Sequence, residues 1–212
     1  MQNNIKIAVI GGTGKSGKYL VQQLLSQGFL LRMLVRKPET SQIKSPPIEV
    51  IQGNARDYEA VRSLIEGCHA VISTLGQPKG ETPIFSQATT NVIRSMNECR
   101  IMRYIVITGL NVDTAFDKKN AKTAFATEWM KTNYQETTAD KQRELEILLE
   151  SNIDWTLVRL PLIELTDRKS EMKASLEDCP GDIISATDLA DFLIGQLSKK
   201  EYLRKSPFIA NV

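Results

Sequence analysis

Runs of consecutive apolar residues alternate along the chain with stretches in which apolar residues recur every three or four positions. The first run, at 5–10 (IKIAVI), ends in glycines, and a helical spacing of Tyr19, Leu20 and Leu24 follows it. Continuous apolar runs are typical of parallel strands that are buried on both faces, and the wider spacing is typical of helices that pack on them. The pattern predicts strands at 5–10, 29–35, 48–52, 70–75, 104–108 and 155–159, and helices at 15–27, 58–66, 85–99, 138–151 and 187–197.

This alternation predicts an α/β fold, namely a Rossmann-type doubly wound parallel sheet with a small C-terminal region on the substrate side. The chain of 212 residues suits a single domain over 1–212. Two segments, 111–133 and 163–183, show neither pattern and are expected to be variable loops. Because each follows the carboxyl end of a strand, where ligands bind in such folds, we expect both to shape a substrate site.

In the glycine-rich stretch 11–17 (GGTGKSG) two phosphate-binding motifs overlap, the GKS ending of a P-loop and the G-x-x-G-x-x-G of a dinucleotide-binding turn. A P-loop would need a glycine where Val9 stands, so that motif is incomplete. The spacing of Gly11, Gly14 and Gly17 instead fits a dinucleotide-binding turn. In that turn the first glycine allows the tight bend, the second lets the backbone approach a pyrophosphate, and the third lets the helix pack closely on the sheet.

The end of the second predicted strand carries Arg36 and Lys37. Enzymes that select NAD usually have a carboxylate there, which binds the ribose 2′-hydroxyl and repels a 2′-phosphate. A guanidinium binds that phosphate in a bidentate manner, and Lys15 beside the turn adds positive charge. The sequence therefore predicts NADP(H) as cofactor in preference to NAD(H). The alternative is that Arg36 and Lys37 are ordinary solvated charges.

Composition excludes several other classes. The formal net charge is +2, and residues of both signs are interspersed, so we expect no nucleic-acid partner. One histidine and three widely separated cysteines predict no metal site and reduced thiols. Neither a cationic leader followed by a long apolar stretch nor a membrane-length apolar window occurs, so we expect a cytoplasmic protein without a membrane partner.

Five stretches in order, GGTGKSG, LVRKPE, GNARD, VISTLG and LLESNIDWTLVRLP, resemble the atypical short-chain dehydrogenases/reductases. The most similar subgroup is the NAD(P)H-binding, NmrA-like group, which is related to biliverdin-IXβ/flavin reductases. The resemblance covers nearly the whole chain. It implies a pyrophosphate turn, a 2′-phosphate contact, an adenine pocket and a nicotinamide side. The implied cofactor residues are Gly11, Thr13, Gly14, Lys15, Ser16, Arg36, Asn54, Ala55, Leu75, Gly76, Thr108, Leu160 and Pro161.

The candidate catalytic residues depart from the pattern of standard short-chain dehydrogenases, which use a serine and a Tyr-x-x-x-Lys pair. Lys141 suits the lysine, which binds the ribose, but the residue four positions earlier is Thr137. Thr108 and Gly109 stand where the strand-end serine is expected. Tyr134, seven residues before Lys141, lies on the same face if the helix is continuous, where it either donates a proton or simply packs.

The absence of that tyrosine does not exclude reduction, because a flavin or quinone can take its proton from water. The resemblance to flavin reductases implies an NADPH-dependent oxidoreductase that transfers hydride to a flat, aromatic small-molecule acceptor. A non-catalytic NADP(H)-binding redox sensor is the alternative, and a nucleotide-sugar epimerase or dehydratase is a weaker one. The sequence leaves open whether the protein is a monomer or a homodimer.

Overall fold

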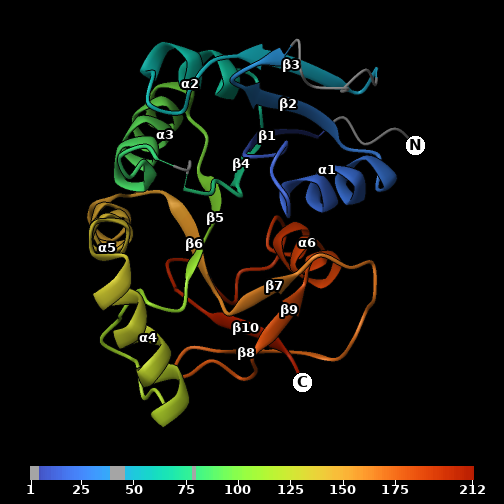
Figure 1. Cartoon of the computed structure of the whole chain (residues 1–212). Coiled ribbons are helices and arrows are strands. Elements are labelled where there is room, and N and C mark those ends of the chain that lie inside the picture. The colour runs from blue at the N-terminus through green and yellow to red at the C-terminus, as the bar shows by residue number, and fades with distance from the viewer. Residues whose placement is uncertain (1–4, 39–45, 78–79) are drawn as a thin grey trace.

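A computed structural model describes residues 5–38, 46–77 and 80–212. Eight strands form one sheet in the order β3-β2-β1-β4-β5-β6-β10-β8 (Figure 1). All neighbouring strands in it are parallel except β10 and β8. This order confirms the predicted doubly wound sheet. The strands are β1 (Lys6–Ile10), β2 (Leu30–Val35), β3 (Ile48–Gln52), β4 (Ala70–Ser73), β5 (Arg103–Gly109), β6 (Asp154–Leu160), β8 (Met172–Ser175) and β10 (Phe208–Asn211).

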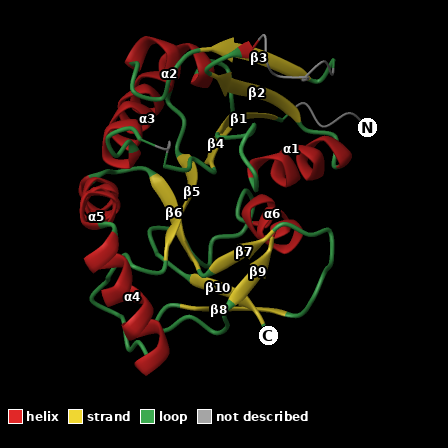
Figure 2. Ribbon diagram, viewed as in Figure 1, coloured by secondary structure: helices red, strands yellow, loops and turns green. Residues whose placement is uncertain are grey.

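Helices cover both faces of the sheet (Figure 2). On one face lie α1 (Gly17–Ser26) and α6 (Ala186–Gly195), and on the other lie α2 (Tyr58–Ile65), α3 (Phe85–Cys99) and α5 (Gln135–Glu150). Each helix was predicted from its apolar spacing, within a few residues at its ends.

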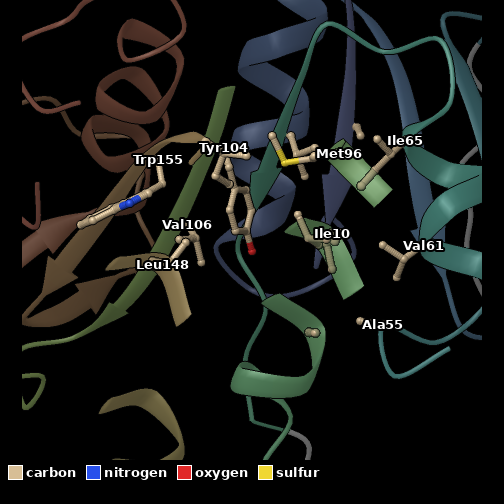
Figure 3. Packing of buried hydrophobic residues seen from close by; sticks show 14 of the residues in the cluster. Ile10, Ala55, Val61, Ile65, Met96, Tyr104, Val106, Leu148 and Trp155 are labelled. Atoms are coloured by element: carbon tan, nitrogen blue, oxygen red, sulfur yellow. The ribbon is translucent and has the colours of Figure 1, made fainter. Parts of the chain in front are cut away.

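Burial on both faces of the sheet explains why residues 7–10 of β1 are all apolar. Ile7 and Val9 pack into the core under α1 and α6, whereas Ala8 and Ile10 pack into the opposite core. Figure 3 shows Ile10 in the second of these cores, with Val61 of α2 and Met96 of α3. Burying such aliphatic side chains contributes about 1.5–3 kcal/mol each, so both faces stabilise the sheet.

The segment 111–133 is not the loop that the sequence predicted. It contains a helix, α4 (Ala121–Asn133), whose first turn is capped by Asn120. The Asn120 side-chain oxygen accepts hydrogen bonds from the backbone N–H groups of Lys122 at 2.8 Å and Thr123 at 2.9 Å. The apolar spacing could not reveal α4, because the helix buries only Thr123 and Thr127.

The prediction of a loop at 163–183 is also wrong. The segment 163–183 contains β8. At its two ends it overlaps the short strands β7 (Leu162–Glu164) and β9 (Ile183–Ser185), and β7 and β9 pair with each other in a second sheet. The sequence also did not predict β10, which lies parallel to β6. Strands of three or four residues are too short for an alternating pattern to stand out.

Arg159 fixes this C-terminal region to the loop that follows β5. Its side chain has no exposed surface, and its guanidinium stacks on the Phe208 ring at 3.5 Å. It donates hydrogen bonds to the Asp117 carboxylate at 2.6 Å and to the carbonyl oxygens of Val112, Leu176 and Ser206. One buried cation therefore joins β6, β10 and two loops.

None of the helices in the described part of the chain is both long and apolar enough to cross a lipid bilayer.

Candidate functional site

The glycine-rich turn between β1 and α1 is closed by its own backbone. Gly11 has a positive φ of 79°, and its carbonyl accepts a hydrogen bond from the Gly14 N–H at 2.9 Å. A Cβ atom on Gly11 would lie 2.6 Å from the Thr74 carbonyl carbon, and one on Gly17 would lie 2.1 Å from the Gly11 oxygen. Real Cβ atoms do not approach so closely, so this turn needs glycine at both positions.

A cavity of about 1240 Å³ opens beside this turn, at the carboxyl ends of β1, β2, β3 and β4. The strand order reverses between β1 and β4, which is the crevice where ligands bind in open α/β sheets. Nine of the predicted cofactor residues line this cavity. They are Gly11, Thr13, Gly14, Arg36, Lys37, Asn54, Ala55, Leu75 and Gly76.

Other predicted residues lie elsewhere. Lys15 and Ser16 are not in the cavity wall, and Gly17 is buried beneath the turn. The wall instead contains Lys18 from the first turn of α1. The remaining four predicted residues are also absent from the wall, and they lie further along the same sheet edge on β5, α5, β6 and the residue after β6: Thr108, Lys141, Leu160 and Pro161.

The charges at the Arg36 end of the cavity are paired. Arg36 Nη1 lies 2.9 Å from Glu81 Oε1, and Arg56 Nη1 lies 3.0 Å from Glu81 Oε2. Glu81 also lines the cavity, together with Gln77. Sequence reasoning missed Glu81 because it follows β4, far along the chain from Arg36, and no motif marks it.

The polar groups at the end of β5 are largely buried. Lys141 Nζ lies 5.0 Å from the centre of the Phe85 ring and would lie 3.4 Å from a Cβ built on Gly109. The structure thus brings Lys141 to the strand end where Thr108 lies. Burial lowers the pKa of the Lys141 ammonium group. Thr108 Oγ1 and Asn111 Oδ1 are buried and have no hydrogen-bond partner within the described ranges.

Gly109 explains the missing serine at this strand end. A Cβ atom there would lie 2.2 Å from Asn111 Oδ1, so a side chain at Gly109 would displace Asn111. Asn111 is itself held by a 2.8 Å hydrogen bond from its Nδ2 to Thr138 Oγ1 on α5. The space that a serine would need is therefore already filled.

Two carboxylates flank Lys141 on α5, and they have different environments. Asp140 accepts hydrogen bonds from the N–H groups of Phe85 at 2.8 Å and Ser86 at 3.3 Å, so it caps the start of α3. Glu144 is buried and accepts a 2.7 Å hydrogen bond from Thr89 Oγ1. Burial raises the pKa of the Glu144 carboxyl to about 7.

The prediction that Tyr134 and Lys141 share one face assumed a helix that includes Tyr134, whereas the helix that carries Lys141 begins at Gln135 with Tyr134 as its N-cap. Tyr134 is the junction between α4 and α5, with φ −136° and ψ 51°. Its side chain is 51% exposed and stacks edge-on against the Trp129 ring at 5.7 Å. The structure therefore favours the packing role. Phe125, one turn before Trp129, is 74% exposed.

Among the described residues, no three His, Cys, Asp or Glu side chains gather in a way that would hold a metal ion.

The fold and the glycine turn together define a Rossmann-type nucleotide-binding protein. A family model described as NAD(P)H-binding matches residues 11–200, and the chain belongs to this family. The match agrees with the predicted resemblance to the atypical short-chain dehydrogenases/reductases of the NmrA-like group.

Relatives and solved structures agree with this family. The chain is 31% identical over 132 residues to isoflavone reductase homolog P3 of Arabidopsis thaliana, covering 57% of this chain and 41% of that protein. It is 28% identical over 138 residues to phenylcoumaran benzylic ether reductase Betv6 of Betula pendula, covering 60% of this chain and 43% of that protein. The chain thus spans about two fifths of the length of these relatives.

A short-chain dehydrogenase/reductase (wide type) from Veillonella parvula, solved in complex with NADP, superposes with a TM-score of 0.80. The alignment covers 99% of this chain and 95% of that chain at 14% sequence identity. At this identity the likeness establishes the fold alone.

Proposed function

We propose that this protein is an NADP(H)-dependent oxidoreductase that transfers hydride to a flat acceptor such as a flavin or quinone. The observation that carries the proposal is the arrangement of two ends along one sheet edge. A glycine turn with an arginine lies at one end of this edge. At the other end lies a half-buried lysine, Lys141, beside buried polar atoms that have no hydrogen-bond partner among the described residues. A dinucleotide cofactor would place its phosphates at the glycine turn and the arginine, and its second ribose at the lysine.

The residues present fit the cofactor. The glycines leave room that a Cβ atom would fill, so backbone N–H groups at the start of α1 would hold the pyrophosphate. Arg36 would bind the 2′-phosphate, and Asn54 and Ala55 would face the adenine. Near β5, the second ribose would be held by the Lys141 ammonium and by the Thr108 hydroxyl, which has no hydrogen-bond partner in the part of the chain that the structure describes.

The bound nicotinamide would supply the hydride. The protein would orient the acceptor and exclude water, and the acceptor would take its proton from solvent. The residue four positions before Lys141 is Thr137 rather than tyrosine, and its hydroxyl is a poor acid, so a carbonyl that needs protonation would be a poor substrate. The names of the relatives, isoflavone reductase homolog and phenylcoumaran benzylic ether reductase, support a small aromatic acceptor.

A redox sensor that binds NADP(H) without consuming it is the second candidate. It is favoured by Gly109, where a serine side chain would collide with Asn111, and by Tyr134, which lies outside the helix that carries Lys141. A sensor would differ in conformation with the reduced and oxidised cofactors and would leave both intact. A cytoplasmic location, and a monomer or homodimer, remain part of the first proposal.

The test is consumption of NADPH by the purified protein, followed at the absorbance band of reduced nicotinamide, with FMN and a small quinone offered in turn. The expected result is protein-dependent loss of NADPH that falls when Lys141 is replaced by methionine. Tight binding of NADPH with no loss for any acceptor would contradict the reductase and favour the sensor.

A further inference from the structure

Glu81 joins two arginines at the end of the cavity where Arg36 lies. Its two carboxylate oxygens are divided between them, with Oε1 at 2.9 Å from Arg36 Nη1 and Oε2 at 3.0 Å from Arg56 Nη1. The side chains of Arg36 and Glu81 are 56% and 41% exposed, so an ion pair between them is weak and can be exchanged for another partner. The Glu81 carboxylate therefore already occupies a position on the Arg36 guanidinium where the phosphate of a ligand would bind.

The segment that carries Glu81 is held in place by other contacts as well. Arg56 Nη2 donates to the Thr82 carbonyl oxygen and, at 3.4 Å, to the Pro83 carbonyl oxygen. Gln77 Nε2 donates to the Glu81 carbonyl oxygen at 2.8 Å. Because these bonds involve the backbone rather than the carboxylate, replacing the Glu81 side chain would leave the segment anchored.

We propose that Glu81 competes with the cofactor's 2′-phosphate for Arg36 and thereby sets the discrimination between NADP(H) and NAD(H). The inference rests on the proposed function, because it assigns the Arg36 end of the cavity to the adenine ribose. A dianionic phosphate and a carboxylate repel each other when they share one guanidinium. The phosphate therefore binds when Glu81 turns away from Arg36 and keeps only its contact with Arg56.

The same carboxylate has the opposite effect on NAD(H). A ribose 2′-hydroxyl is a hydrogen-bond donor, and a carboxylate is the group that accepts from it in NAD-selective folds. In those folds the carboxylate lies at the end of the second strand, whereas here it comes from the segment after β4. Glu81 thus weakens NADPH binding and supports NADH binding.

The test is isothermal titration of NADPH and NADH into wild type and Glu81→Gln at low salt. Glu81→Gln is expected to bind NADPH about threefold to fivefold more tightly, which is the range for one exposed ionic contact, and to bind NADH no better than wild type. The matched control is Glu98→Gln, since Glu98 is 42% exposed, pairs with Arg62 at 3.2 Å and does not line the cavity. The control should leave both affinities unchanged.

A double-mutant cycle with Arg36→Gln separates competition from a general effect of charge. In the Arg36→Gln background, Glu81→Gln should no longer change NADPH affinity. A gain that persists without Arg36, or a ratio of NADPH to NADH affinity that Glu81→Gln leaves unchanged, overturns this inference alone. If wild type binds neither cofactor, the proposed function itself fails, and this inference fails with it.

Discussion

The two ends of the candidate site are built in different ways. The end at the glycine turn consists of backbone, and its charged side chains, Arg36 and Glu81, are exposed and paired on the surface. The end at β5 consists of buried side chains around Lys141, among them Glu144. A surface charge can be changed with little effect on folding, whereas a change to a buried charged group alters the free energy of unfolding. Binding and stability should therefore respond differently at the two ends.

The largest effect on the free energy of unfolding is expected at Arg159, the buried cation that holds the loops near the end of β5. Arg159→Met would leave the Asp117 carboxylate and three carbonyl oxygens without their donor. Breaking one partner of a buried ion pair costs about 3–5 kcal/mol, which urea denaturation at pH 7 would measure. Arg143→Met removes an exposed arginine paired with Glu146 at 2.8 Å and should not move the unfolding curve. A similar curve for both variants would contradict the account.

At the β5 end, Glu144 should make the free energy of unfolding depend on pH. Because the pKa of the Glu144 carboxyl in the folded protein, about 7, lies above its ordinary value of 4.5, the folded state holds a proton that the unfolded state releases. The free energy of unfolding of wild type should therefore fall as pH rises from about 5 to about 8, by about 2–3 kcal/mol.

Glu144→Gln keeps an oxygen that can accept from Thr89 and carries no charge, so it should lose this pH dependence and be the more stable form at pH 8. Urea denaturation of both proteins at pH 5 and pH 8 measures the difference. A constant difference between them across this range would contradict the buried, protonated carboxyl.

At the turn, Gly17→Ala should affect binding. Its Cβ atom would collide with the Gly11 oxygen, so the turn would have to open. We expect NADPH binding to weaken by at least about thirtyfold, or about 2 kcal/mol, in a fluorescence titration. Gly195→Ala is the control, since the nearest atom to its Cβ, Lys199 Cε, is 4.0 Å away. Unchanged affinity in Gly17→Ala would show that the turn does not hold the cofactor.

The smallest effect is expected at the surface. Arg36→Glu should weaken NADPH binding about tenfold more than NADH binding, because only NADPH carries the 2′-phosphate. The protein should unfold at the same urea concentration as wild type, since the Arg36 side chain is 56% exposed. Titration of both cofactors tests this, and equal losses for the two would contradict the assignment of Arg36.

The sequence predicted what depends on local pattern. The apolar run of β1, the glycine turn and Arg36 are consecutive or evenly spaced residues, so their positions in the fold follow from neighbours along the chain. It missed α4, because that helix lacks an apolar face, and it missed Glu81, because its pairing with Arg36 arises only when β2 and the segment after β4 meet in space. The break between α4 and α5 at Tyr134 depends on its backbone angles, which cannot be predicted from the residue type.

The central claim is that one dinucleotide spans both ends of the site. Isothermal titration of wild type and Lys141→Met with NADPH and with 2′,5′-ADP, which has only the adenine half, tests it directly. We expect Lys141→Met to weaken NADPH binding by about tenfold or more, the loss of one charged hydrogen bond, and to leave 2′,5′-ADP binding unchanged. Equal weakening of both ligands, or no change in NADPH, would contradict the claim that Lys141 lies at the second ribose.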